Sequence, residues 1–310
     1  MADVGLRNGT IQIVVLAHNE EARIDACLDS LPVGEPGIAL SVVVNGSTDR
    51  TAEIVKARSD SGVELVEYAE GGKARSWNRF VLDQAPKADV FVFVDGDAAL
   101  LPGSVYRLAE AIRAAPGVNA AAGVPANGRT AWLYRRSILR GKGLFGDCYA
   151  LSGDFVQRLR ASGIRLPDDL VGDDGLIRAL ACTDLGPDSE WRSERVVPCR
   201  NAGFLCEPNR LTLQGLRQQS ARMVNYSLRH FQNLIVRDVM RGVGPTGLPS
   251  MLAQLYPAYL PRFRARLSPV WYWSDRQALA LMQARVPVGV PADQASGAAS
   301  STRHAPPAAR

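Results

Sequence analysis

Several patterns that define common classes of protein are missing from the sequence. There is no run of 18 or more apolar residues, so no segment is long enough to cross a membrane as a helix. The first ten residues contain no apolar signal core. The five cysteines are widely spaced and form no CxxC pair, which disfavours disulfides and zinc. We therefore expect a cytoplasmic protein, either soluble or held peripherally at the inner face of the membrane.

Fingerprints of several enzyme classes are missing as well. No G-x-G-x-x-G follows the first apolar run and no G-x-x-x-x-G-K-[ST] is present, which disfavours dinucleotide oxidoreductases and P-loop NTPases. The absence of G-x-S-x-G and H-E-x-x-H argues against a serine hydrolase or a zinc protease. No known nucleic-acid-binding module is present, so we expect no nucleic-acid partner.

The composition is that of a globular protein with an uneven distribution of positive charge. The chain has 310 residues, 46% of them hydrophobic and 22% charged, and a net charge of +5. Between Glu190 and Trp273 there are twelve arginines, four acidic residues and no lysine. This excess suits a phosphate-bearing or membrane-surface partner, and an ordinary solvated surface is an equal alternative.

The first hundred residues alternate between strand and helix patterns. Apolar, β-rich runs occupy residues 11–17, 40–44, 63–68 and 90–94, and segments with helical spacing separate them. This alternation predicts an α/β fold with a mostly parallel sheet flanked by helices. Polar residues follow three of the four runs, and parallel strands place such residues along one edge of the sheet. They are Asn19, Glu20, Asn45, Ser47, Asp49, Asp95 and Asp97.

Beyond Val118 the pattern is irregular, with short strands expected within 144–153 and 195–198. We predict a catalytic domain over residues 1–241, a helical, amphipathic extension over 242–290 and a disordered tail over 291–310. Within the extension, arginines and aromatic residues mix in a way typical of a segment that lies on a bilayer. Packing onto the catalytic domain is the favoured alternative.

The strongest single pattern is Asp95-Gly96-Asp97, which ends the apolar run at 90–94. Two carboxylates around a glycine offer hard oxygen ligands to Mg²⁺ or Mn²⁺, and the bound cation would hold a diphosphate. Aspartate and glycine are also common turn residues, so a simple turn at the end of a strand is the alternative.

Six segments, taken together and in order, resemble the family-2 glycosyltransferases, which have a Rossmann-like GT-A fold and use nucleotide-sugar donors. The segments are Ala17–Glu21, Asn45–Thr51, Gly72–Asn78, Asp95–Asp97, Gly172–Asp174 and Gln219–Met223. Asp95–Asp97 looks like the family's D-x-D, Gly172–Asp174 is similar to its acidic pair, and Gln219–Met223 is similar to its Q-x-x-R-W. The resemblance covers about residues 11–225.

The resemblance also implies roles for individual residues. Asp97 would bind the metal, and Asp95 would contact the metal or the ribose. Asp174 would be the catalytic base, with Asp173 close behind, although Asp173 could simply cap a helix. Further donor-binding residues implied by the resemblance are Asn19, Glu20, Asn45, Asp49, Lys73, Gln219 and Arg222. The alternatives are a turn and helix cap for Asn45–Asp49 and a solvated surface lysine for Lys73.

The sequence thus predicts an inverting, divalent-metal-dependent glycosyltransferase that moves one sugar from a nucleotide-diphosphate sugar to an unknown acceptor, lipid-linked or small. A sugar nucleotidyltransferase and a non-catalytic nucleotide-sugar-binding relative are the alternatives. Two departures from the family pattern matter. Val44-Asn45 stands where Asp-Asp is common, which leaves the nucleotide open, and Met223 replaces the usual tryptophan, which leaves the acceptor open.

Overall fold

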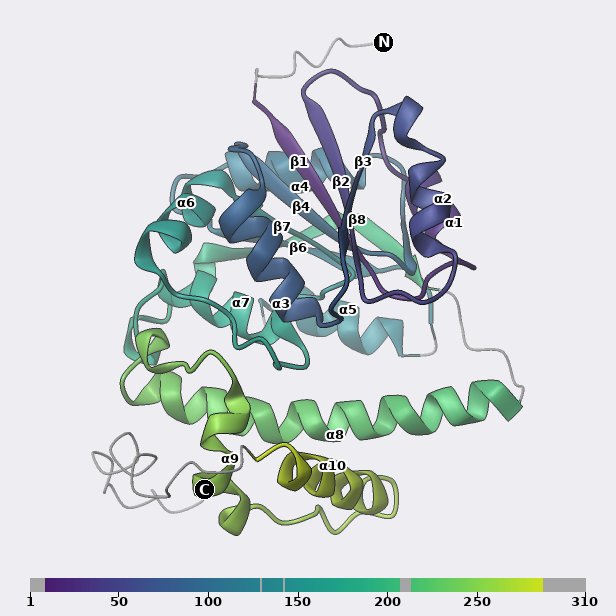
Figure 1. Ribbon diagram of the computed structural model, residues 1–310. Coiled ribbons are helices and arrows are strands. Elements are labelled where there is room, and N and C mark those ends of the chain that lie inside the picture. Colours follow the sequence, from purple (N-terminus) through teal and green to yellow (C-terminus); the bar gives the residue numbers. More distant parts are fainter. Residues whose placement is uncertain (1–8, 129, 142, 207–212, 287–310) are drawn as a thin grey trace. The chain divides into compact units, whose positions relative to one another are not determined.

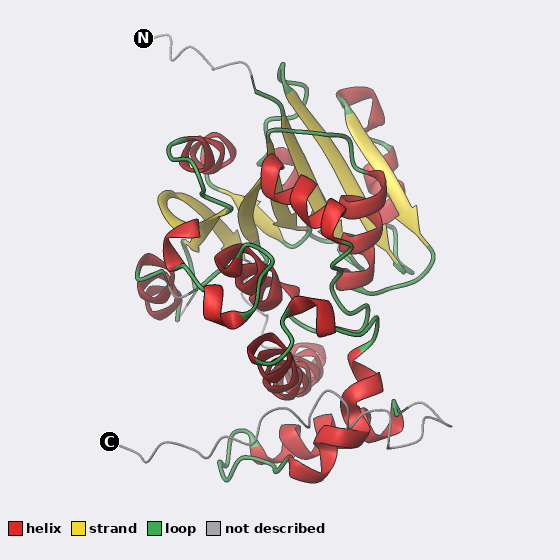
Figure 2. Cartoon of the chain, turned by 90° about the vertical axis from the view of Figure 1, so that its left-hand side faces the viewer, coloured by secondary structure: helices red, strands yellow, loops and turns green. Residues whose placement is uncertain are grey.

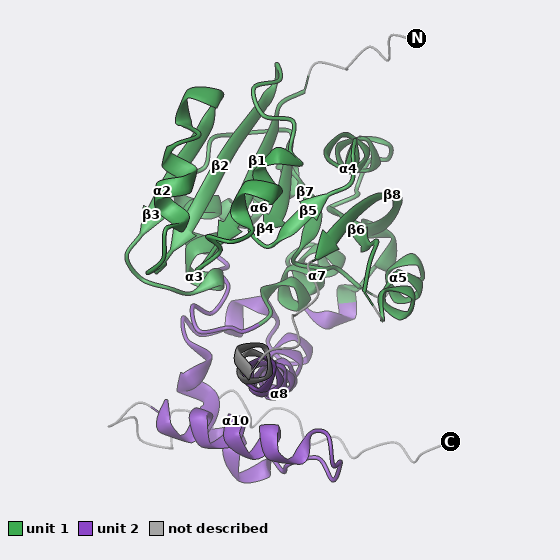
Figure 3. Ribbon diagram, turned by 90° about the vertical axis from the view of Figure 1, so that its right-hand side faces the viewer, with its two compact units in different colours: residues 1–163, 172–185, 190–209 green, residues 164–171, 186–189, 210–310 purple. Residues whose placement is uncertain are grey.

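The computed structural model describes residues 9–128, 130–141, 143–206 and 213–286. The chain divides into two compact units (Figure 3). The first unit comprises Met1–Gly163, Gly172–Leu185 and Glu190–Asn209, and the second comprises Ile164–Val171, Gly186–Ser189 and Arg210–Arg310. The domain boundary predicted at residue 241 stays a prediction, and the predicted tail at 291–310 lies outside the described residues.

The first unit is built on one mixed sheet, and the predicted α/β class is confirmed (Figure 1). Eight strands of the described residues take the order β3-β2-β1-β4-β7-β6-β8-β5. They are β1 (Ile11–Ala17), β2 (Ile38–Asn45), β3 (Val63–Tyr68), β4 (Val90–Asp95), β5 (Ala98–Leu100), β6 (Ala120–Pro125), β7 (Cys148–Ser152) and β8 (Val196–Cys206). The first four strands are mutually parallel, as predicted, whereas β7 runs antiparallel to β4 and to β6.

Strands β1 and β4 are central because their side chains can be buried on both faces of the sheet. Every residue of β1 is buried, and so are the five apolar residues of β4. Helices flank the sheet on both sides, which explains the continuous apolar runs (Figures 1 and 2). Val92 and Val94 belong to the main hydrophobic core, whereas Phe91 and Phe93 face the opposite side and stack on each other.

The helices of the first unit connect and cover these strands. They are α1 (Ile24–Asp29), α2 (Thr51–Lys56), α3 (Lys73–Trp77), α4 (Ser104–Arg113), α5 (Ala131–Leu139), α6 (Gly153–Ser162) and α7 (Asp173–Thr183). Helix α3 continues as a π-helical segment, Asn78–Gln84. Helix α6 begins with an N-cap, because the Ser152 hydroxyl accepts a hydrogen bond from the backbone N–H of Phe155.

The second unit is helical. Its helices are α8 (Leu213–Arg241), α9 (Tyr256–Tyr259) and α10 (Tyr272–Ala284). Leu228, Phe231 and Ile235 are buried and recur at helical spacing along α8, and α10 packs against this helix. No helix of the described residues is both long and apolar enough to cross a membrane.

Candidate active site

A cavity of about 470 Å³ opens at the carboxyl ends of β1 and β4. Strand β1 has β2 on one side and β4 on the other, so the chain reverses its direction of winding between them. Open α/β sheets bind ligands at this kind of switch point. The polar side chains around the cavity are His18, Glu20, Asn45, Lys73, Asp95 and Asp97.

Three carboxylates converge beside this cavity. One oxygen from each of Asp95, Asp97 and Asp147 lies within 4.8 Å of the other two. Asp147 immediately precedes β7, and the antiparallel pairing of Cys148 with Val94 brings it next to the end of β4. Asp147 was not predicted from the sequence. Three carboxylates at this spacing form a donor set that suits Mg²⁺ or Mn²⁺.

Lys73 lies between two parts of the acidic cluster. Its Nζ is 2.6 Å from Asp95 Oδ1, donates a hydrogen bond to Asp95 Oδ2 at 2.8 Å, and lies 3.7 Å from Asp173 Oδ1. Lys73 begins α3, and Trp77, one turn later, donates a hydrogen bond to the Tyr149 hydroxyl at 3.0 Å. The bond between Trp77 and Tyr149 therefore restrains the helix that carries Lys73, and carboxylates hold the Lys73 ammonium group.

Arg23 is a second cation at the site that was not predicted from the sequence. Its guanidinium lies 2.5 Å from Glu20 and 3.5 Å from Asp97. Glu20 and Arg23 are three residues apart, which is a spacing that allows contact on a helical turn. The pair connects the end of β1 to the Asp-Gly-Asp turn.

Burial, together with repulsion between neighbouring carboxylates, raises the pKa of three of these acids. Burial raises the pKa of Asp95 to about 7, although Lys73 opposes the shift. Burial and the Asp97 charge raise the pKa of Asp147 to about 6 and that of Glu20 to about 7. Burial alone would lower the pKa of Lys73, but the charges of Asp173 and Asp95 raise it well above the ordinary value, so the ammonium form is stabilised. A divalent cation among these carboxylates would offset the excess negative charge.

Asp173 and Asp174 lie in the first turn of α7, where the helix dipole stabilises negative charge. Both residues are buried, with 3% and 6% of their surface exposed. Gly172, in the left-handed region with φ 83°, occupies the N-cap position, so Asp173 is the first helical residue and not the cap. The charge of Asp174 contributes to the raised pKa of Asp147. The acidic pair thus lies beside the carboxylate cluster.

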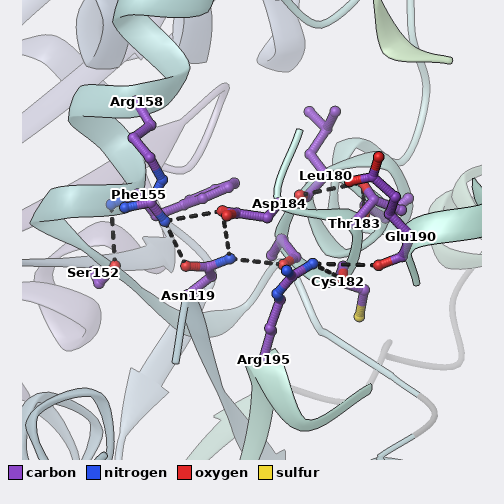
Figure 4. A network of polar contacts seen from close by, with 12 residues as sticks. Asn119, Ser152, Phe155, Arg158, Leu180, Cys182, Thr183, Asp184, Glu190 and Arg195 are labelled. Carbon is purple, nitrogen blue, oxygen red and sulfur yellow. Dashed lines mark hydrogen bonds and ion pairs between the residues drawn. The ribbon is translucent and has the colours of Figure 1, made fainter. Parts of the chain in front are cut away.

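A polar network fixes the opposite end of α7 (Figure 4). Asp184, which follows the helix, accepts hydrogen bonds from Asn119 at 3.0 Å and from Arg158 at 2.9 Å. Arg195 donates to the carbonyl oxygen of Cys182 at 3.0 Å. These bonds connect α7 to α6 and to the start of β6, and they thereby restrain the helix that carries the acidic pair.

Two of the expected donor-binding residues, Asn45 and Asp49, make hydrogen bonds to the backbone of the loops at the strand ends. The Asn45 side chain is buried, donates to the Ala17 carbonyl oxygen at 2.9 Å and accepts from the Gly72 N–H at 3.1 Å. Asp49 accepts from the backbone N–H of Glu21 and of Thr51, both at 3.0 Å. These bonds agree with the turn alternative, whereas Arg50 and not Asp49 occupies the N-cap position of α2. The contact of Asn45 and Asp49 with a nucleotide stays a prediction.

The remaining predicted residues are Asn19, Gln219 and Arg222. Asn19, with φ 56°, accepts a hydrogen bond from the Thr48 N–H at 2.8 Å and so joins the loops after β1 and β2. Gln219 and Arg222 lie on α8 in the second unit. Their predicted closure over the donor stays a prediction.

A mixed sheet of this kind, with acidic residues gathered at the strand ends, matches the GT-A fold. The chain belongs to glycosyl transferase family 2, whose model matches residues 12–167. No curated protein matches the chain.

Solved structures share the fold. A mannosyltransferase from Pyrobaculum calidifontis in complex with GDP-Man and Mn²⁺ is 23% identical, with a TM-score of 0.57 over 95% of this chain and 81% of that chain. A glucosyl-3-phosphoglycerate synthase from Mycobacterium tuberculosis, in complex with Mn²⁺, UDP and phosphoglyceric acid, is 22% identical, with a TM-score of 0.50 over 71% of this chain and 78% of that chain.

Proposed function

We propose that the protein is an inverting, divalent-metal-dependent glycosyltransferase that moves one sugar from a nucleotide-diphosphate sugar to a hydroxyl acceptor. One observation carries this proposal: Lys73 contacts both Asp95, which belongs to the carboxylate trio that could hold a metal, and Asp173 at the start of α7. Group transfer from a diphosphate needs both charge neutralisation at the leaving group and a base at the acceptor.

The metal would be held by Asp95, Asp97 and Asp147 as Mg²⁺ or Mn²⁺. When bound, the cation would offset the negative charge that develops on the departing nucleotide diphosphate. The solved mannosyltransferase contains GDP-Man with Mn²⁺ and the solved synthase contains UDP with Mn²⁺, which supports a donor of this class. Arg23 and Lys73 would hold the surrounding acids in position.

We assign the base to Asp174. Asp173 faces the Lys73 ammonium at 3.7 Å. Asp174 follows it in the same turn, accepts a hydrogen bond from the Gly175 N–H at 2.9 Å, and its charge contributes to the raised pKa of Asp147. An acceptor hydroxyl that gives its proton to Asp174 would attack the anomeric carbon opposite the diphosphate. In-line attack of this kind inverts the configuration at that carbon.

The two alternative functions are less well supported. A sugar nucleotidyltransferase would carry a glycine-rich, basic loop after the first strand, whereas this chain has Ala17-His18-Asn19-Glu20 there. A binding-only relative would not need acids beside the metal-competent trio, yet Asp173 and Asp174 are buried there at a cost in desolvation.

The test compares Asp174→Asn with Asp154→Asn, a matched control in the first turn of α6. Mn²⁺-dependent binding of GDP and UDP is measured by calorimetry. Turnover is measured as the release of GDP from GDP-Man and of UDP from UDP-Glc. We expect Asp174→Asn to bind normally and to lose turnover at least about 100-fold. Asp154→Asn should retain both properties. Near-normal turnover of Asp174→Asn would show that the base is assigned wrongly.

A further inference from the structure

The second unit exposes an apolar tip at the turn that leads into α10. Leu267 is 97% exposed, Val270 is 65% exposed and Trp273 is 69% exposed, and these three side chains lie within seven residues. Single exposed apolar residues are common, but a cluster that includes a leucine and a tryptophan usually marks a contact surface. We call these three residues the apolar tip.

An ion pair between Arg266 and Asp275 restrains the backbone that carries the apolar tip. Arg266 contacts both carboxylate oxygens of the fully buried Asp275, at 2.9 and 2.7 Å, and its backbone N–H donates to the same carboxylate at 2.8 Å. The Arg266 guanidinium also lies 4.4 Å from the ring centre of Trp271. The ion pair therefore fixes the backbone on both sides of Leu267 and Val270.

Positive charge predominates in the sequence around the apolar tip. From Gly242 to Arg285 the only acidic residue is Asp275, and Arg266 neutralises it. The same segment carries five arginines, namely Arg262, Arg264, Arg266, Arg276 and Arg285. Arg262, Arg264 and Arg276 are exposed. Exposed arginines beside exposed apolar side chains match a lipid surface, which has negative headgroups outside and an apolar layer beneath.

We propose that the apolar tip and its arginines dock the protein on an anionic bilayer. Leu267, Val270 and Trp273 enter the interfacial layer, where tryptophan is favoured, while the arginines contact lipid phosphates. A second copy of the chain fits this surface less well, because pairing two such surfaces would bring arginines against arginines. The proposal concerns a membrane surface and does not depend on the transfer reaction.

The test is co-sedimentation of the full chain with vesicles of phosphatidylcholine alone or with 30% phosphatidylglycerol. We expect binding to the anionic vesicles, weak binding to the neutral ones, and loss of binding as the salt concentration rises. Leu267→Ser combined with Trp273→Ser should weaken binding at least about tenfold. Arg262→Gln combined with Arg264→Gln should weaken binding roughly 20- to 30-fold, at about fivefold for each arginine.

Val243→Ser is the matched control, because Val243 is 54% exposed in the same unit but lies outside the tip. It should bind vesicles like the unchanged chain. Circular dichroism and the melting temperature, measured on every variant, report whether the protein is folded and keep this test separate from the test of the transfer reaction.

Three results would overturn the proposal. The first is equal binding to neutral and anionic vesicles, or no binding to either. The second is unchanged binding after both tip substitutions. The third is a concentration-dependent dimer in light scattering that the tip substitutions abolish, because the surface would then join two copies of the chain.

Discussion

Replacing Lys73 with methionine would remove the ammonium group that lies between Asp95 and Asp173. The Nζ atom is 2.6 Å from one carboxylate and 3.7 Å from the other, and Asp173 is only 4% exposed through its side chain. Methionine fills a similar volume but leaves both carboxylates without this partner. The variant should therefore fold into a less stable protein in the absence of metal.

The size of the effect follows from the burial of the pair. Removing one partner of a buried ion pair costs about 3–5 kcal/mol, and we expect about 3 kcal/mol because 31% of the Lys73 side chain is exposed. In a unit of roughly 200 residues, this loss corresponds to a melting temperature about 6–12 °C lower. Asp95→Asn should relieve part of the loss, because the uncompensated charge is then absent.

The assay is thermal and urea unfolding in the presence of EDTA, with Lys56→Met as the control. Lys56 is exposed near the end of α2, so this control should change the free energy of unfolding by less than about 0.5 kcal/mol. The double variant of Lys73 and Asp95 should show a coupling of at least about 1 kcal/mol. Equal stability of the Lys73 and Lys56 variants, or purely additive losses in the double variant, would refute the reasoning.

Two further predictions concern pH. Because burial raises the pKa of Asp147 from 3.8 to about 6, the folded protein loses stability as the pH rises from about 4 to about 6. Without metal, Asp147→Asn should therefore raise the free energy of unfolding by up to about 3 kcal/mol above pH 6 and by nearly nothing at pH 4. An equal gain at both pH values in urea unfolding would contradict this. Burial would raise the pKa of Asp275, but the bonds from Arg266 lower it to about 2, so this carboxylate stabilises the fold above pH 4 and ceases to do so as the pH falls towards 2. Asp275→Asn should thus cost about 2 kcal/mol at pH 7 and roughly half as much at pH 3; a loss that does not shrink on acidification would argue against the ion pair.

The parallel half of the sheet could be predicted because its strands are long apolar runs. Residues 11–17 and 90–94 are buried on both faces, so local sequence and tertiary environment agree there. The strand expected at 195–198 instead extends to Cys206 as β8. Its later part contains Arg200 and Asn201, and its pairing with both β6 and β5, rather than its composition, decides its length.

The site was predictable where it depends on strand ends and not where it depends on strand direction. Asp95 and Asp97 follow a recognisable strand. Asp147 stands before a strand that runs the opposite way, and nothing in Gly146-Asp147-Cys148 indicates that it will meet Asp95. The position of Lys73 likewise depends on Trp77 and Tyr149, which become neighbours only after the sheet has formed.

The most direct test of metal-dependent donor binding is calorimetric titration of GDP and UDP into the protein with Mn²⁺ or with EDTA, repeated on Asp97→Ala. We predict that at least one of the two nucleotides binds only when Mn²⁺ is present, and that Asp97→Ala weakens this binding about 100-fold or more. Nucleotide binding that is equally tight in EDTA, or unchanged in Asp97→Ala, would contradict a metal site at the ends of β1 and β4.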